Sequence, residues 1–147
     1  MRLRIREAVQ RDSEQLVKLS DELLHLEDWS TREVMFTESL NDPASTIFVA
    51  EEGETIVGFV EVRVFPDFVE GSPIAILLNL VVAKAYRWQG IGSRLIQRAG
   101  EAADKRSATE IHVWTEFDNQ QAIHLYTKHG FTDRRLLLER ERESHAS

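Results

Sequence analysis

The sequence predicts an α/β fold of the α+β type, in which helices cover one sheet and the element order is β-α-α-β-β-β-α-β-α-β. Apolar residues alternate in several short segments, as in half-buried strands, and recur every three or four positions in others, as in amphipathic helices. One segment, 74–83, is apolar on both faces, as a covered central strand should be. The length of 147 residues suits one domain, 1–147.

Each predicted element rests on its periodicity and on the turn residues at its ends. In order, they are a strand 2–8, a helix 12–26, a helix from about 30 to 40, two strands of a hairpin within 46–65, a strand 74–83, a helix from 90 to about 106, a strand 110–117, a helix 118–130 and a strand 131–141.

Local signals justify these elements in turn. Val34, Phe36 and Leu40 are predicted to face inward from the second helix, and the stretch "EEGE" at 51–54 is a hairpin signal. The helix after residue 90 has one apolar stripe, formed by Ile91, Leu95, Ile96, Ala99, Ala102 and Ala103. For the helix 118–130, Asp118 and Gln121 are predicted to form a capping box.

Composition excludes several classes of protein. Cysteine is absent, which removes disulfides and thiolate chemistry, and no metal-ligand spacing is present. No apolar run is long enough for a membrane span and no signal peptide is recognised, so we expect a cytoplasmic protein without membrane contact. The net charge is -7, and the segment 84–98, with four basic residues and no acidic one, is short. Nucleic acid is therefore not expected as a partner.

The stretch "YRWQGIGSR" raises the central question of function, because Gly90 and Gly92 lie where a strand gives way to a helix. Such a turn can bind an anion, since the first N–H groups of a helix lack partners within it. Arg87 and Arg94 add positive charge. The glycines alone also agree with a simple tight turn. The P-loop and dinucleotide-binding motifs are excluded, because neither the lysine nor the third glycine is present.

The surrounding residues resemble one known family. "VVAKAYRWQGIGSRLI" closely resembles the acetyl-CoA-binding signature of the GNAT superfamily of N-acetyltransferases, and "NQQAIHLYTKHGF" resembles its second signature. The matching element order runs from residue 2 to about residue 139. Within the superfamily, the sequence is also weakly similar to aminoglycoside 6′-N-acetyltransferases. The resemblance implies a mixed, mostly antiparallel sheet splayed at the central strand, and acetyl-CoA as cosubstrate.

The resemblance also implies where acetyl-CoA binds. Its pantetheine arm would pair with the backbone at the end of the central strand, and its pyrophosphate would lie on the glycine turn. The implied cofactor-binding residues are Leu80, Val81, Val82, Arg87, Trp88, Gln89, Gly90, Ile91, Gly92, Ser93, Asn119 and Tyr126. For Asn119, a role at the helix terminus alone agrees with the sequence equally well.

Two residues are implied in catalysis. Tyr126 matches the family tyrosine that protonates or stabilises the departing thiolate, although a role as a core aromatic residue agrees with the sequence as well. Asn79 is the polar residue of the central strand and would bind substrate or water, or else be a buried amide. The strand lacks the glutamate that many relatives use as general base. Glu61, Glu116 and Asp118 are the fallback candidates.

Substrate choice in such proteins depends on two loops that here combine aromatic and acidic residues, a pattern that suits a cationic amine. The predicted substrate-binding residues are Glu27, Asp28, Trp29, Phe65 and Asp67. We expect an N-acetyltransferase that acetylates a small primary amine by direct transfer in a ternary complex. A protein or peptide acceptor, and a coenzyme A-binding sensor without turnover, are the alternatives; a homodimer is left open.

Overall fold

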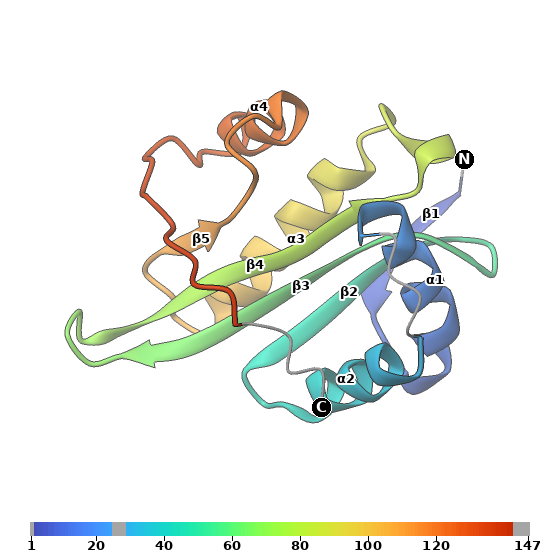
Figure 1. The fold of residues 1–147 in the computed structure, drawn as a ribbon, viewed down its shortest axis with the longest axis horizontal. Helices are drawn as coiled ribbons and strands as arrows, with labels where there is room; N and C mark the ends of the chain where they lie inside the picture. Colours follow the sequence, from blue (N-terminus) through green and yellow to red (C-terminus); the bar gives the residue numbers. More distant parts are fainter. Residues whose placement is uncertain (1, 25–28, 143–147) are drawn as a thin grey trace. The chain divides into compact units, whose positions relative to one another are not determined.

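The computed structural model describes residues 2–24 and 29–142. Their contacts divide the chain into two compact units, 1–113 and 114–147, and each is described by itself. The first unit contains β1 (Leu3–Glu7), η1 (Gln10–Asp12), α1 (Ser13–Leu24), α2 (Trp29–Asn41), β2 (Ser45–Glu52), β3 (Thr55–Asp67), β4 (Ser72–Val82), η2 (Lys84–Tyr86), α3 (Ile91–Lys105) and β5 (Ile111–Val113), and the second contains α4 (Gln120–Lys128) (Figure 1).

The first unit is built on a five-stranded sheet in the order β1-β2-β3-β4-β5. Neighbouring strands from β1 to β4 are antiparallel, and β5 is parallel to β4. The predicted hairpin at 51–54 is confirmed: β2 and β3 are joined there, and Gly53 has a φ of 61°, a conformation that glycine adopts without steric cost. The mixed, mostly antiparallel sheet that the family resemblance implied is therefore present.

Helices α1 and α2 cover one face of the sheet and α3 covers the other (Figure 1). Strand alternation decides which helix each side chain meets. On β2, Ile47 and Val49 pack with Leu16 of α1 in one buried cluster. Phe48 points to the opposite face, where the guanidinium of Arg98 on α3 lies 5.0 Å from its ring centroid. Burial of such side chains stabilises the fold by about 1.5–3 kcal/mol each.

Strand β4 contains a bulge that changes which face its residues occupy. Phe59 of β3 pairs with Val81, but Glu61 pairs with Leu78. Strand β4 therefore has one more residue than β3 between these two pairs. Asn79 lies in the bulge with a φ of 54°. Without the extra residue, alternation would turn Val81 away from α1; with it, Val81 joins the core cluster under that helix.

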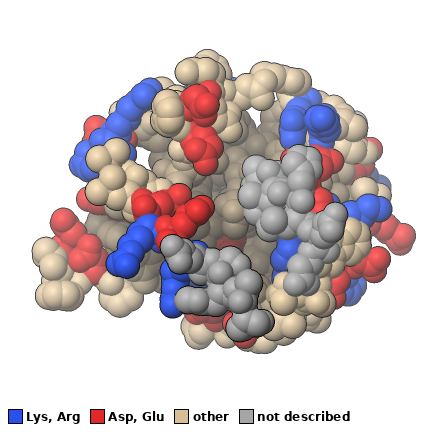
Figure 2. Space-filling model, viewed as in Figure 1, with Lys and Arg blue, Asp and Glu red and all other residues tan. Residues whose placement is uncertain are grey.

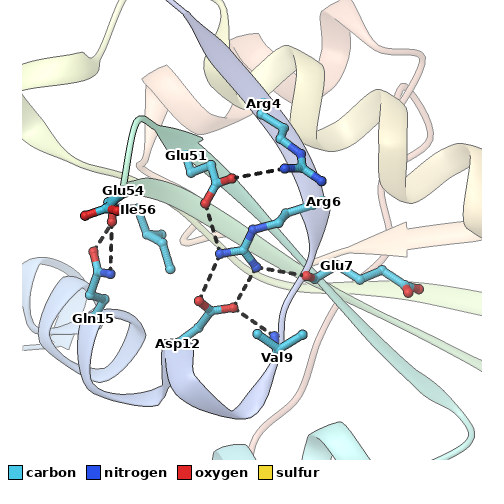
Figure 3. Close-up of polar contacts among 9 residues, drawn as sticks. All are labelled: Arg4, Arg6, Glu7, Val9, Asp12, Gln15, Glu51, Glu54 and Ile56. Atoms are coloured by element: carbon cyan, nitrogen blue, oxygen red, sulfur yellow. Dashed lines mark hydrogen bonds and ion pairs between the residues drawn. The ribbon is translucent and has the colours of Figure 1, made fainter.

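A group of charged residues fixes the entry to α1 (Figure 3). The guanidinium of Arg6 on β1 donates to both carboxylate oxygens of Asp12, at 2.8 and 3.0 Å, and also pairs with Glu51 of β2 at 3.0 Å. The Asp12 carboxylate accepts a further bond from the Val9 N–H. Burial alone would raise the pKa of Asp12, but the bonds from Arg6 and Val9 outweigh burial and lower this pKa below its ordinary value. These bonds tie β1 and β2 to η1, the turn that leads into α1.

Three predicted details are wrong at the level of single residues. Val34 is exposed, whereas Phe36 and Leu40 pack against the core; Val34 is two positions from Phe36, and residues two apart cannot share a helix face. Strand β5 has three residues instead of eight, because a turn follows it. The N-cap of α4 is Asn119, whose side chain accepts from the Ala122 N–H at 3.1 Å, and not Asp118.

The predicted last strand, 131–141, is also wrong. The described residues from 131 to 142 form no strand, and Leu136, Leu137 and Leu138 are exposed. The alternation of charged and apolar residues satisfies the pattern of a strand, but a strand also needs a partner for its backbone N–H and C=O groups. Among its described residues the second unit contains the helix α4 and no strand that could be such a partner.

Candidate active site

One edge of β4 is open at its C-terminal end. Pairing with β5 ends at Leu77, which faces Val113, while β4 continues to Val82. The Ala83 N–H donates to Val57 on the β3 side, so alternation directs the backbone groups of Leu80 and Val82 to the open edge. Val81, by contrast, directs its carbonyl toward β3. The sheet is thus splayed here. Three residues, Leu80, Val81 and Val82, were predicted to pair with pantetheine, and the N–H and C=O groups of Leu80 and Val82 face the gap.

The glycine turn follows directly. Gly90 is the N-cap of α3 with a φ of 80°, and it makes no side-chain cap bond because it has no side chain. A Cβ atom at Gly90 would meet no atom within 4 Å, so space is open beside it. Gly92 is already the second residue of the helix. The N-terminus of α3, with its partial positive charge, therefore faces an open site that suits a phosphate group.

Arg87 is held in place by neighbours on both sides. Its Nε atom donates to the Val82 carbonyl at 3.2 Å, and its Nη2 atom lies 3.9 Å from the carboxylate of Glu22 on α1. The same carboxylate accepts from the Lys84 N–H at 3.0 Å. Glu22 and Arg87 thus join the end of α1 to the turn, a contact that sequence reasoning missed because Glu22 is 62 positions from Lys84.

A pocket of about 220 Å³ lies between the two N-terminal helices and the sheet. Its lining residues come from five elements: Leu16, Val17, Ser20, Arg32, Met35, Phe36, Ser39, Ile47, Phe59, Glu61, Asn79 and Val81. Asn79 and Val81 belong to the bulged, open part of β4, so the pocket reaches the strand that the sequence assigns to acetyl-CoA. Acidic and basic side chains are interspersed on the face shown in Figure 2.

Glu61 is a carboxylate in the wall of this pocket, and its side chain is 14% exposed. The Ser45 hydroxyl donates to one of its oxygens, and the guanidinium of Arg63 lies 3.6 Å away. Arg63 also pairs with Asp42 at 2.6 Å. Two carboxylates therefore share one guanidinium, which leaves a net negative charge beside the pocket. Arg63 itself does not line the pocket, whereas Arg32 does, and Arg32 is paired with the carboxylate of Asp21 on α1.

Asn79 lines the same pocket and is exposed, so the sequence-based alternative of a buried amide is wrong. The bulge explains this position, because it interrupts the regular ladder that would otherwise enclose the side chain. The predicted substrate residues Trp29, Phe65 and Asp67 do not line the pocket. The indole N–H of Trp29 donates to Asp21 at 3.0 Å. Glu27 and Asp28 lie outside the described residues.

The second unit holds the remaining predicted residues. Tyr126 is 8% exposed, and its ring meets that of Phe131 edge-on, with 5.8 Å between the centroids. Burial raises the pKa of the Tyr126 phenol. Asn119 caps α4, whereas Glu116 and Asp118 are exposed. The predicted roles of Asn119 and Tyr126 toward acetyl-CoA stay predictions.

The chain can now be compared with known proteins. A model of the acetyltransferase (GNAT) family matches residues 5–131. The chain belongs to this family. The acetyltransferase is 29% identical over 141 residues to an N-alpha-acetyltransferase of Sulfurisphaera tokodaii, a match that covers 91% of this chain and 83% of the relative.

Two further likenesses are informative. Over 100 residues the acetyltransferase is 32% identical to the aminoglycoside N(6′)-acetyltransferase type 1 of Serratia marcescens, covering 65% of this chain and 68% of that one. The crystal structure of a transcriptional regulator from Bacillus halodurans C-125 has a TM-score of 0.89 and 31% identity, covering 96% of this chain and 100% of that one. The predicted family, fold class, enzyme class and acetyl-CoA as acetyl donor are confirmed.

Sequence reasoning missed most of the pocket wall. The α2 residues Arg32, Met35 and Phe36 line it, but α2 has no fully buried residue and only weak amphipathicity, so no strong periodic signal marked it. Among the described residues, no group of three acidic, histidine or cysteine side chains could hold a metal ion. No described helix of the acetyltransferase combines the length and apolar character that a membrane crossing needs.

Proposed function

We propose that the protein transfers the acetyl group of acetyl-CoA to the primary amine of a small cationic molecule, by direct attack in a ternary complex. One observation carries this proposal. The pocket with Glu61 in its wall reaches Asn79 and Val81, which belong to the open part of β4. An acceptor in the pocket would thus lie beside the strand that offers backbone partners to the pantetheine arm.

The charge of the pocket supports a cationic acceptor. Glu61 and Asp42 share the single guanidinium of Arg63, so an ammonium group gains a favourable interaction near Glu61. The apolar wall, which includes Met35 and Phe36, would contact the carbon skeleton of the acceptor. The 32% identity to an aminoglycoside N(6′)-acetyltransferase of Serratia marcescens supports this substrate class, because aminoglycosides are small polycationic amines.

The reaction needs one proton acceptor and one proton donor. Acetyl-CoA supplies an activated thioester. Glu61 takes a proton from the ammonium group, and Asn79 binds the acceptor or a water through its exposed amide. As the new N–C bond forms and the C–S bond breaks, Tyr126 gives its phenol proton to the sulfur, and the second proton that the amine nitrogen loses restores the phenol. Because its pKa is raised by burial, the phenol keeps this proton at neutral pH.

The test is a panel of amines in an assay that detects the free thiol of coenzyme A. The chain has no cysteine, so a thiol reagent reports released coenzyme A without background from the protein. We expect turnover with small polyamines or aminoglycosides and little with monoamines of equal size, which carry a single positive charge. Turnover should fall about 100-fold in Tyr126→Phe, the usual scale for a lost general acid. Equal rates on polyamines and monoamines would contradict the substrate class.

A coenzyme A-binding sensor without turnover is the second candidate. It is favoured by the 31% identity to a protein described as a transcriptional regulator. Its other support, the lack of a carboxylate on the central strand, is weakened because Glu61 of β3 lies in the pocket. Peptides with free N-termini belong in the same panel, because another relative is an N-alpha-acetyltransferase. Tight acetyl-CoA binding without turnover on any amine or peptide would favour the sensor.

The glycine turn provides a direct test of cofactor binding. Gly92→Glu puts a negative side chain in the first turn of α3, where the pyrophosphate is proposed to lie, and like charges repel. We expect calorimetry to detect no acetyl-CoA binding by this variant, while circular dichroism shows an unchanged helix content. Saturating acetyl-CoA should stabilise the wild type by about 2.7 kcal/mol at 100 times Kd and the variant not at all. Unchanged binding would contradict this assignment of the turn.

A further inference from the structure

Trp88 is unusual in both its backbone and its exposure. It has a φ of 66° although it is not glycine, and its side chain is 85% exposed. A left-handed conformation is unfavourable for an L-residue, because its Cβ atom comes too close to the following carbonyl oxygen. The exposed indole leaves a large apolar ring in water, so it gives the core almost nothing in return. Strain of this kind is kept where the surrounding structure uses it, which makes a binding role the first explanation to test.

The position of Trp88 in the turn suggests what it binds. The residue lies between η2 and Gly90, in the turn proposed to hold the pyrophosphate of acetyl-CoA. Coenzyme A extends from its pyrophosphate in two directions, with pantetheine on one side and adenosine on the other. The open edge of β4, with Leu80 and Val82, accounts for the pantetheine side. The adenosine must leave the turn on its solvent side, where the exposed indole is the large flat surface.

We infer that the indole of Trp88 is a stacking platform for the adenine ring of acetyl-CoA. Purine rings stack on exposed aromatic side chains, and truncation of the aromatic residue weakens binding measurably. The left-handed backbone sets the direction of the Cα–Cβ bond of Trp88, which limits the places that the indole can reach. The inference rests on the proposed use of acetyl-CoA.

The charges around the turn agree with an adenosine phosphate at this place. Lys84 and Arg94 are exposed on either side of Trp88 in sequence, and neither has an ion-pair partner within 4 Å among the described residues. The nearest carboxylate contact in the turn, Glu22, accepts from the Lys84 backbone and pairs with Arg87 instead. Two cationic side chains are thereby left to meet the phosphates that flank the adenosine.

The experiment compares two variants and two ligands. Trp88→Gly removes the indole but keeps the turn, because glycine adopts a φ of 66° without strain, whereas Trp88→Phe keeps an aromatic ring. Calorimetry measures the Kd of coenzyme A and of 4′-phosphopantetheine, which lacks adenosine. We expect Trp88→Gly to weaken coenzyme A about 10-fold and Trp88→Phe about threefold or less, a scale typical of base stacking on an aromatic ring. Neither variant should change the Kd of 4′-phosphopantetheine.

Tryptophan fluorescence supplies a second readout. Coenzyme A should quench part of the emission of the wild type, 4′-phosphopantetheine should not, and the quenching should be absent in Trp88→Phe. An unchanged coenzyme A Kd in Trp88→Gly, or an equal loss for both ligands, would overturn the platform while leaving the proposed acetyltransferase intact. If the wild type itself does not bind coenzyme A, the proposed function fails, and the platform fails with it.

Discussion

Glu61 is a carboxylate in the pocket wall, and the proposed mechanism uses it to accept a proton from the amine. Its carboxylate is fixed by the Ser45 hydroxyl and by Arg63, so its direction is set before a substrate binds. A base held in this way needs little reorganisation when it accepts a proton. A substitution of Glu61 therefore tests proton transfer directly.

Glu61→Gln separates charge from shape. The amide oxygen of glutamine can still accept the bond from Ser45, but the side chain can neither take a proton nor attract an ammonium group. We expect kcat on a cationic amine to fall about 100-fold, at the lower end of the range for general bases. The matched control is Glu38→Gln on the exposed face of α2, which should leave kcat unchanged. Equal kcat values for wild type and Glu61→Gln would remove Glu61 from the mechanism.

Tyr126 predicts a change in stability at alkaline pH. Burial raises the phenol pKa in the folded state above the ordinary value of 10.0, so the unfolded chain loses this proton first. The contribution of Tyr126 to stability is therefore complete below pH 10 and is lost as the pH rises through the folded pKa. Urea unfolding from pH 9 to 11 should show a steeper loss in the wild type than in Tyr126→Phe. Parallel curves would show that the phenol is not shifted.

Strand β4 has two parts with different neighbours. Its first part pairs with both β3 and β5, and its last part pairs with β3 alone. The bulge at Asn79 turns this last part so that Val81 meets α1 and Asn79 enters the pocket. A close contact from β3 holds the bulged segment, because Gly58 lies directly beneath the Val81 carbonyl.

Gly58→Ala tests this contact at the scale of the element. A Cβ atom at Gly58 would lie 3.0 Å from the Val81 carbonyl oxygen and 3.2 Å from Leu95 on α3, so β4 or α3 must shift. We expect a loss of about 1–3 kcal/mol in unfolding free energy, as for overpacked cores, together with weaker acetyl-CoA binding.

Gly100→Ala is the matched control for Gly58→Ala. A Cβ at Gly100 meets no atom within 4 Å, and its place within α3 favours alanine. This variant should gain about 0.4–1 kcal/mol and bind acetyl-CoA normally. A neutral effect of Gly58→Ala on both stability and binding would show that β4 has room to move.

The stability of the first unit depends on the ion pair between Arg6 and Asp12. The Asp12 side chain is 3% exposed and that of Arg6 15%, so Asp12→Asn leaves a largely buried guanidinium with Glu51 as its remaining carboxylate. We expect a loss of about 3 kcal/mol near pH 7, measured by urea unfolding. Asp104→Asn on the exposed end of α3 is the control and should change little.

Wild type and Asp12→Asn should also differ in how their stability changes at acid pH. Because the folded pKa of Asp12 is lowered, its contribution to stability is present above its ordinary pKa of 3.8 and is lost as the pH falls through the folded value. Wild type and Asp12→Asn should therefore approach each other in stability below pH 3.8. A constant difference down to pH 2 would mean that the carboxylate is not the titrating group.

The sequence by itself determined most of the elements, the hairpin at 51–54 and the glycine turn at 90–92. Each of these depends on residues close together in the chain, through helical or strand periodicity and through glycine at a positive φ. Two short signatures were also enough to predict the family and acetyl-CoA, because the turn and helix proposed to hold the phosphates are local structures.

The tertiary structure decided what depends on residues far apart. The bulge that carries Asn79 into the pocket exists only in the register between β3 and β4, and the place of Glu61 beside α2 follows from that pairing. The segment 131–141 has the pattern of a strand but forms none among the described residues, because pairing needs a partner that its own sequence does not supply. Register and pairing are properties of two segments at once, so one segment's pattern does not determine them.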